Sequence, residues 1–185
     1  RNFGDNFTIS ELRDSVEYAH NKNVKVYFTI NAIISENEID SLKKFIKNIK
    51  FIDFDAYIVS DLSVIELLKK EFPCPRIHIS TQLSISNHIA LNFWAKIGAS
   101  RVNLARELSY KDVCEIVKKS KIEVEVFVHG ALCISYSGRC MLSKYLSGRD
   151  ANKGKCSHTC RWKYFLIEEK RQNMFFPIDM DKRGT

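Results

Sequence analysis

The chain has 185 residues, of which 45% are hydrophobic and 28% are charged, a composition typical of a globular domain with a substantial core. No apolar stretch approaches the roughly 20 residues that span a bilayer, and no charged-then-apolar leader opens the chain, so we expect no membrane partner. Because nothing indicates secretion, we expect a cytoplasmic protein in which clustered cysteines stay reduced and bind metal or act in catalysis.

Helical and strand-like patterns alternate through the first 130 residues. The helices have apolar periodicity and recognisable caps: Ser10 at the start of the first, a capping box of Ser35 and Glu38 at the second, and Gly98 at the end of the fourth. Strands are predicted where β-branched and aromatic residues gather. In chain order we expect a helix over 10–22, a strand over 24–31, a helix over 35–49, a strand over 56–61, a helix over 62–72, a strand over 76–81, a helix over 86–98, a strand over 101–106, a helix over 110–120 and a strand over 124–130.

This alternation predicts an α/β fold with a parallel sheet and right-handed crossovers. Five strands fit either an open doubly wound sheet or part of a (β/α)8 barrel, and periodicity does not choose between them. No GxGxxG or P-loop motif follows a strand, so a nucleotide site has no support. We place a boundary near residue 130: residues 1–130 form the sheet domain, and residues 131–185 form a Cys-rich, basic segment packed on it.

Polar side chains stand at the end of every predicted strand. Because the carboxyl ends of parallel strands share one rim, we expect these side chains to form a common site. Taken singly, each could be a cap or a turn residue, and Asp61 could cap the helix that follows it. The residues are Asn31, Ser60, Asp61, Ser80, Thr81, Gln82, Arg106, Glu107 and His129.

Four cysteines follow the last predicted strand within 28 residues: Cys133, Cys140, Cys156 and Cys160, with the spacing C-x6-C-x15-C-x3-C. Thiolates this close together indicate a metal or iron–sulfur site before they indicate disulfides. Structural zinc usually takes two short knuckles, so the wide spacing favours an iron–sulfur cluster and leaves zinc as the alternative. Cys74 and Cys114 lie apart and are expected to be small buried hydrophobic residues.

Positive charge is concentrated in the same part of the chain. From Arg139 to Arg171, nine Lys and Arg residues stand against three acidic residues, which leaves a net charge of +6 there and +1 in the rest. Tyr145, Trp162 and Phe165 are interleaved with these cations, and such a mixture suits RNA because cations neutralise phosphates and rings stack on bases. A solvated face that only keeps the protein soluble is the alternative interpretation.

Longer motifs in this sequence resemble the collagenase-like peptidase family, the thirty-second family of peptidases of unknown mechanism. The resemblance covers essentially the whole chain and implies a TIM-barrel-like domain whose opening strand or strands precede Arg1, so the fold expected here is an incomplete (β/α) barrel. The matching stretches are EVFVHGALC (125–133), GRCMLS (138–143), SKYLSGRDANKGKC (143–156), CRW (160–162), STQ (80–82), Asn87 and LARE (104–107).

The resemblance implies a cofactor and a reaction class as well as a fold. Several members of the family are oxygen-independent hydroxylases of transfer RNA uridine, ribosomal RNA cytidine or the ubiquinone ring, and they use a four-iron [4Fe-4S] cluster. In the RNA-modifying members prephenate is the implicated oxygen source. By resemblance, Cys133, Cys140 and Cys156 are three cluster ligands, and the fourth is either Cys160 or a cysteine beyond Thr185.

The expected function is therefore hydroxylation of RNA, at a transfer RNA wobble uridine, with prephenate as oxygen donor. Arg106, with Arg139 or Arg149, would clamp a small dicarboxylate by bidentate pairing. Proton transfer would fall to Glu107 and other strand-end groups. The full set of candidate residues is Arg106, Glu107, His129 and Asp61 for catalysis, and Asn31, Thr81, Gln82, Arg139, Arg149 and Arg161 for substrate binding.

Two other functions remain open. A peptidase would need an activated nucleophile, and the sequence contains no HExxH or GxSxG motif, although a cysteine nucleophile built on Cys133 and His129 is conceivable. The other alternative is a non-catalytic RNA-binding subunit, because some relatives work as heteromeric pairs with a related subunit.

Overall fold

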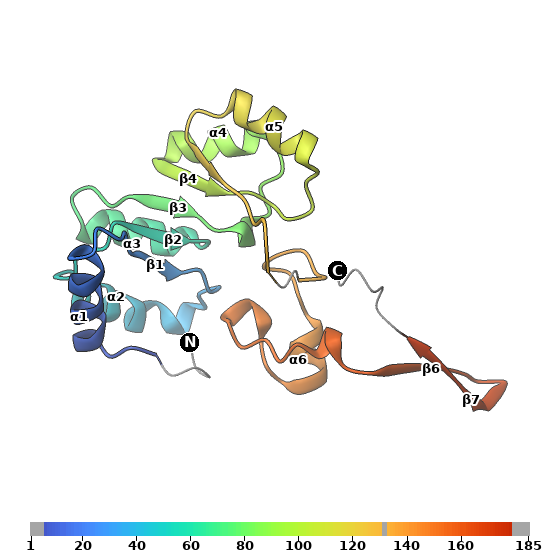
Figure 1. The fold of residues 1–185 in the computed structure, drawn as a ribbon. Coiled ribbons are helices and arrows are strands. Elements are labelled where there is room, and N and C mark those ends of the chain that lie inside the picture. The colour runs from blue at the N-terminus through green and yellow to red at the C-terminus, as the bar shows by residue number, and fades with distance from the viewer. Residues whose placement is uncertain (1–5, 131–132, 179–185) are drawn as a thin grey trace.

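Five parallel strands form one sheet in which the strand order follows the chain order (Figure 1). The structure is a computed structural model that describes residues 6–130 and 133–178. Each neighbouring pair of strands is parallel, so every connection must cross over through a helix, and the predicted α/β architecture is confirmed. The strands are β1 (Tyr27–Ile30), β2 (Ala56–Val59), β3 (Ile77–Ile79), β4 (Ala99–Asn103) and β5 (Glu123–Glu125).

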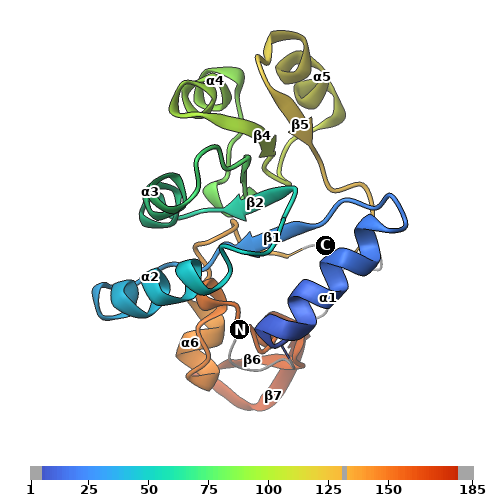
Figure 2. The same cartoon turned by 90° about the vertical axis from the view of Figure 1, so that its left-hand side faces the viewer.

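The helices lie along the outside of this sheet, beside the strands that they connect (Figure 2). Among the described residues, none of the helices has both the length and the apolar character that crossing a membrane requires. The helices of this part are α1 (Ile9–His20), α2 (Ile39–Asn48), α3 (Leu62–Glu71), α4 (His88–Ile97) and α5 (Tyr110–Lys119), with short 3-10 turns η1 (Glu36–Glu38) and η2 (Thr81–Leu83).

Local capping signals determine where the helices begin. The first helix is capped by Thr8 and not by Ser10 as predicted, because Thr8 is extended and forms a reciprocal capping box with Glu11. The predicted box of Ser35 and Glu38 is confirmed, although it opens the turn η1 that precedes α2.

The core lies between the helices and the outer face of the sheet. Side chains alternate along β3, so Ile77 and Ile79 are buried in the same cluster as Leu68 and Leu91 from the helices. His78, between the two isoleucines, points to the opposite, inner face of the sheet, where it is only 2% exposed. The inner face therefore carries polar chemistry even in the middle of a strand.

The last strand is shorter than predicted. β5 ends at Glu125, whereas the pattern predicted a strand over 124–130. Its partner β4 pairs with it only from Arg101 to Asn103, and then the chain turns so that the N–H of Leu104 donates to the carbonyl of Glu125. Beyond this point β5 has no neighbour to pair with among the described residues, and Val128 is 91% exposed.

The rest of the chain forms short elements followed by a hairpin. The Cys-rich part lies beside the sheet, and the two-stranded antiparallel hairpin extends away from it (Figure 1). Sequence patterning did not reveal the hairpin, because its strands are a mostly apolar run (YFLIE) and a polar start followed by an apolar run (RQNMFFPI), and neither has the alternation that marks a half-buried strand. The elements are α6 (Leu142–Ser147), η3 (Ala151–Lys153), η4 (Thr159–Arg161), β6 (Tyr164–Glu168) and β7 (Arg171–Ile178).

Candidate functional site

Four polar side chains at the carboxyl ends of β1, β2 and β3 form one hydrogen-bond network. The Asn31 amide donates to the Ser80 hydroxyl at 3.2 Å, and the Ser60 hydroxyl donates to the carbonyl of Asn31 at 2.9 Å. Ser60 also lies 3.3 Å from the side-chain oxygen of Gln82, whose backbone N–H donates to Ser80. Three of the five strand ends that the sequence singled out therefore converge on a single polar rim.

Thr81 and Asp61 extend this rim but are occupied by structural hydrogen bonds. The Thr81 hydroxyl donates to the carbonyl of Leu104, which ties η2 to the end of β4. Asp61 caps α3 by accepting from Ser63, and it also accepts from the backbone N–H of Ile34 at 3.0 Å. Burial alone would raise the pKa of Asp61, but these hydrogen bonds outweigh it and lower the pKa. Asp61 is thus held as a carboxylate at the helix start.

A tight turn of the Cys-rich segment is docked directly on this rim. The Arg106 guanidinium donates to the hydroxyl of Ser137, a residue that is buried, and the Ser84 hydroxyl donates to the Ser137 carbonyl at 3.3 Å. Gly138 follows with φ of 73°, and a Cβ atom placed there would lie 2.7 Å from the carbonyl oxygen of Gln82. Only glycine allows the two backbones to approach this closely.

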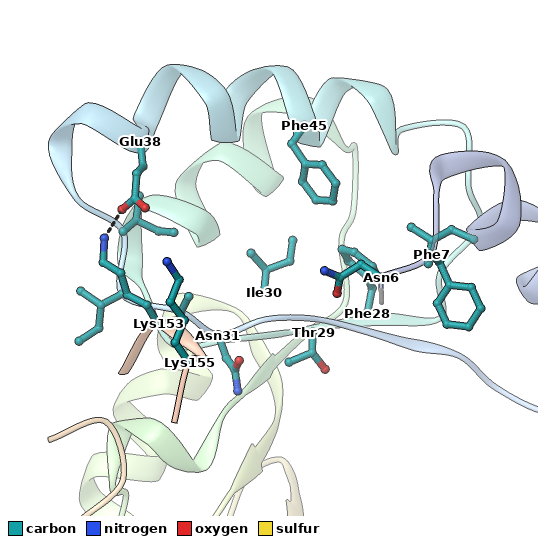
Figure 3. Close-up of a pocket in the computed structure, with 15 residues that line it drawn as sticks. Asn6, Phe7, Phe28, Thr29, Ile30, Asn31, Glu38, Phe45, Lys153 and Lys155 are labelled. Carbon is teal, nitrogen blue, oxygen red and sulfur yellow. Dashed lines mark hydrogen bonds and ion pairs between the residues drawn. The ribbon is translucent and has the colours of Figure 1, made fainter. Parts of the chain in front are cut away.

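A second turn, 150–155, fastens the same segment to the loop after β1. The backbone carbonyl of Asn152 accepts from Ile33 at 3.2 Å, and the Lys153 ammonium binds Ser35 at 2.5 Å. The same ammonium lies 2.5 Å from the Glu38 carboxylate (Figure 3). Together with the backbone N–H of Ser35, Lys153 lowers the pKa of Glu38 to about 2. The segment is therefore tied to the barrel at two separate points.

The cysteines lie between and beside these ties. All six cysteines are free thiols; Cys133 is exposed, and Cys140, Cys156 and Cys160 are half-buried. Within residues 6–130 and 133–178, no three His, Cys, Asp or Glu side chains are grouped closely enough to hold a metal ion. Assignment of the four thiols as ligands remains a prediction. Cys74, expected to be buried, is exposed, because it sits in a connection beyond the end of α3.

Three serine hydroxyls form a hydrogen-bonded cluster at Ser157, the residue that follows Cys156. Ser143 lies 2.9 Å from Ser157 and accepts from its backbone N–H, while Ser147 lies 2.7 Å from the same hydroxyl. The sulfur of Cys156 accepts a hydrogen bond from the backbone N–H of His158 at 3.3 Å. Hydrogen bonds to the ligand sulfurs are one of the factors that set the reduction potential of an iron–sulfur cluster.

The other predicted site residues are not part of the rim. Glu107 and His129 are exposed, and His129 lies beyond the end of β5 rather than at a strand end. Arg139 and Arg161 are exposed on the Cys-rich segment, and Arg149 is half-buried there, with its backbone carbonyl accepting from Ser143. These groups face solvent or the segment itself.

A cavity of about 800 Å³ opens beside the rim, between β1, α1, α2 and turn 150–155 (Figure 3). Phe28, Ile30 and Phe45 line its apolar side. Lys153 and Lys155 enter from the Cys-rich segment at one end (Figure 3). The cavity therefore combines apolar walls with a polar end, at which Lys153 is paired with Glu38 and Lys155 adds a further cation.

A second polar network fills the inner face of β3, β4 and β5. Arg101 binds Glu123 at 2.6 Å and Glu125 at 3.3 Å, and the Asn103 amide donates to Glu125 at 2.8 Å. Burial, assisted by the positive charge of Arg101, lowers the pKa of His78 to about 4, so this imidazole is neutral at pH 7. The network holds the inner face of the sheet together below the rim.

Sequence reasoning missed the residues that dock the two parts on each other. Ser137, Asn152 and Lys153 lie in a stretch without periodicity, and their partners are distant in sequence. Gly138 did carry a signal, since it falls inside one of the quoted family motifs, but the motif does not say what the glycine contacts. Asn103 gave no strand-end signal, because it lies inside the strand predicted over 101–106 and ends only the observed strand β4.

Comparison with known proteins decides the family. The model described as "Peptidase family U32" matches residues 1–185. The chain belongs to peptidase family U32. A solved structure of a U32 peptidase superposes with a TM-score of 0.52 at 17% identity, over 63% of this chain and 51% of that one, so the fold is shared.

Three relatives illustrate the range of this U32 family. Over 91% of its own length, this chain is 40% identical to the "tRNA hydroxylation protein P" of Escherichia coli K12. Over 88% of its own length, it is 32% identical to the "23S rRNA 5-hydroxycytidine C2501 synthase" of the same organism. It is also 40% identical to an "uncharacterized protease" of Methanocaldococcus jannaschii over 92%. The chain spans 37%, 24% and 42% of the lengths of these three proteins.

Proposed function

We propose that this chain is the barrel and cluster-binding part of an RNA hydroxylase that uses an iron–sulfur cluster and no molecular oxygen. The substrate we propose is a transfer RNA wobble uridine, with prephenate as the oxygen donor. The observation that carries the proposal is the docking of the Cys-rich segment on the polar rim, because this docking anchors the turn that immediately precedes Cys140. Relatives named for hydroxylation of transfer RNA and ribosomal RNA support the choice of reaction.

The chemistry of the donor set fits a four-iron cluster. Four free thiols lie within 28 residues, and the sulfur of Cys156 already accepts a backbone N–H. Cys133, Cys140 and Cys156 would hold the cluster, with Cys160 as the candidate for the fourth position. When bound, such a cluster supplies one-electron redox chemistry.

The rim and the basic segment would supply substrate binding. Arg106 has one guanidinium nitrogen on Ser137, and its Nε is buried without a hydrogen-bond partner among the described residues. A carboxylate of the donor is a suitable partner for this fork. The exposed Arg139 and Arg161 would contact RNA phosphates, because cations that face solvent can reach a polyanion.

Peptidase activity is the second candidate, and one observation favours it: a relative that is 40% identical is named as a protease. Among the described residues, the structure offers no activated nucleophile for peptide hydrolysis. Cys133 and His129 are both exposed, and neither is oriented by a third group among the described residues. We therefore rank peptide hydrolysis below RNA hydroxylation.

Two measurements test the proposed function. Anaerobically reconstituted protein should be brown and absorb near 400 nm, and Cys133→Ala should remove this absorbance while Cys114→Ala, on the outer helix α5, should retain it. Mass spectrometry of transfer RNA from a deletion strain should show loss of a hydroxylated wobble uridine. Unchanged RNA together with lost peptide hydrolysis would favour the peptidase, and unchanged RNA with retained RNA binding would favour a non-catalytic subunit.

A further inference from the structure

The side chain of Asn152 forms a two-point clamp on the backbone of Cys140. Its oxygen accepts from the N–H of Cys140 at 3.2 Å, and its amide group donates to the carbonyl of Cys140 at 3.0 Å. Asn152 is only 9% exposed, so the two hydrogen bonds are shielded from water. A single side chain thus fixes both polar backbone groups of a predicted cluster ligand.

The backbone of Asn152 is itself anchored to the barrel. Its carbonyl accepts from Ile33, in the loop that follows β1, and the next residue, Lys153, binds Ser35 and Glu38 in the same region. Asn152 therefore connects Cys140 to the carboxyl end of β1 through one residue.

Cys140 is also restrained from its other side. Ser137 and Gly138, only two to three residues earlier, are docked on Arg106, Ser84 and the carbonyl of Gln82. Restraint on both sides leaves little freedom for the backbone of Cys140. A ligand that is ordered in advance loses less conformational entropy when it binds its group.

We propose that Asn152 is a positioning residue that holds Cys140 over the barrel rim, ready for ligation. In so far as it concerns the cluster, this inference rests on the function proposed above. The geometry of the clamp does not depend on that function, so it can be tested on the thiol itself.

The chain contains a matched control for this clamp. Asn92, on α4, also clamps a backbone: its amide donates to the carbonyl of Lys119 at 3.0 Å, and its oxygen accepts from the N–H of Lys121 at 3.0 Å. This second clamp joins α4 to the connection before β5 on the outside of the sheet. Asn→Asp at either position removes one donor, keeps the side-chain shape and adds a charge facing a carbonyl.

The first experiment measures the alkylation rate of each cysteine in the metal-free protein, by iodoacetamide labelling and peptide mass spectrometry. Asn152→Asp should raise the rate at Cys140 at least fivefold and leave Cys114 unchanged. Asn92→Asp should lower the melting temperature about as much as Asn152→Asp does. It should leave the alkylation rate at Cys140 unchanged. Equal acceleration of all cysteines, or no change at Cys140, would overturn the proposal by reducing Asn152 to a general stabilising residue.

The second experiment measures iron bound per chain after anaerobic reconstitution. We expect Asn152→Asp to bind at most half as much iron as the unsubstituted chain, and Asn92→Asp to bind the same amount. If the unsubstituted chain binds no iron, the proposed cofactor fails, while the labelling contrast still decides the role of Asn152. Should Asn152→Asp not fold, Asn152→Ser and Asn92→Ser provide the same comparison without a new charge.

Discussion

At the scale of single residues, the contact between the two parts of the chain depends on Gly138. Its φ of 73° is a conformation that residues with a Cβ adopt with strain, and the Cβ itself would meet the carbonyl of Gln82 at 2.7 Å. Gly148 has almost the same φ, 70°, but nothing lies within 4 Å of the position of its Cβ. A comparison of Gly138 with Gly148 therefore separates the effect of backbone strain from the effect of the close approach to the Gln82 carbonyl.

Gly138→Ala should therefore destabilise the protein by about 2 kcal/mol or more, because it combines strain with a clash against backbone that cannot move aside. Gly148→Ala should cost only about 1 kcal/mol, from strain alone. Urea unfolding followed by circular dichroism measures both values. Equal losses for the two variants would contradict the docked position of the turn.

His78 makes stability depend on pH. Its pKa is about 4 in the folded protein and about 6.5 in the unfolded chain, so the unfolded state binds the proton more tightly. The contribution is fully present above pH 6.5 and is lost as the pH falls toward 4. From pH 7 to pH 5 we expect a loss of about 2 kcal/mol in the free energy of unfolding, at about 1.4 kcal/mol per pH unit below 6.5.

His78→Phe should remove most of this loss, since phenylalanine keeps a ring beside Tyr27 and has no proton to bind. Denaturant unfolding at pH 7 and at pH 5 gives the comparison. An unaltered pH dependence in His78→Phe would rule out His78 as its source.

At the scale of elements, the sheet and the hairpin differ in what supports them. β2 and β3 lie inside the sheet and contribute Val59 and Ile79, which are fully buried, to the core. The hairpin β6–β7 pairs only with itself among the described residues, and every one of its residues but the half-buried Tyr164 is exposed. An isolated two-stranded hairpin is marginally stable in water, even with a contact such as that between Phe165 and Phe175.

Hydrogen exchange should reveal this difference. Backbone amides of β6 and β7 should exchange at least about 100-fold faster than those of β2 and β3, because opening the hairpin does not require unfolding the core. Mass spectrometry of the exchanged peptides measures the ratio, with α5 as an internal reference on the outer layer. Equal protection of hairpin and sheet would mean that another surface covers the hairpin in solution.

At the scale of the whole molecule, charge and fold divide the chain in the same way. The sheet part is nearly neutral, whereas the stretch from Arg139 to Arg171 carries +6 and is docked beside the rim. Such a distribution would orient a polyanion toward the candidate site, because the attraction is strongest where the positive charge is densest. The salt dependence of binding to the proposed RNA substrate measures this electrostatic attraction.

Binding of transfer RNA should weaken as salt concentration rises. Replacing both Arg139 and Lys163 by Gln should lower the slope of log affinity against log salt by about 1.4, at about 0.7 per cation for single-stranded contacts. The control replaces Lys47 and Lys50, exposed at the end of α2, and should leave the slope unchanged. A slope that falls equally in both variants would place RNA over the whole surface instead of the Cys-rich segment.

Short windows of the sequence predicted the five strands of the sheet, their helices and the cysteine chemistry of the chain, but not the hairpin β6–β7. Strand and helix periodicity, caps such as Ser35 with Glu38, and the four clustered thiols are properties of short windows, where local propensity and spacing decide. For the same reason the sequence predicted a strand over 124–130, whereas the strand in fact ends at Glu125. Residues 126–130 have the local preference for a strand but lack a partner strand among the described residues.

Which of these groups lie in contact became clear only from the folded chain. Ser80 lies 49 residues from Asn31, and Lys153 lies 118 residues from Ser35, yet each pair is hydrogen-bonded. Contacts across such separations depend on which strands lie side by side and where a turn docks, and no short window encodes them. The cysteines were visible in the sequence; that Asn152 and Gly138 hold one of them against the barrel rim followed only from the fold.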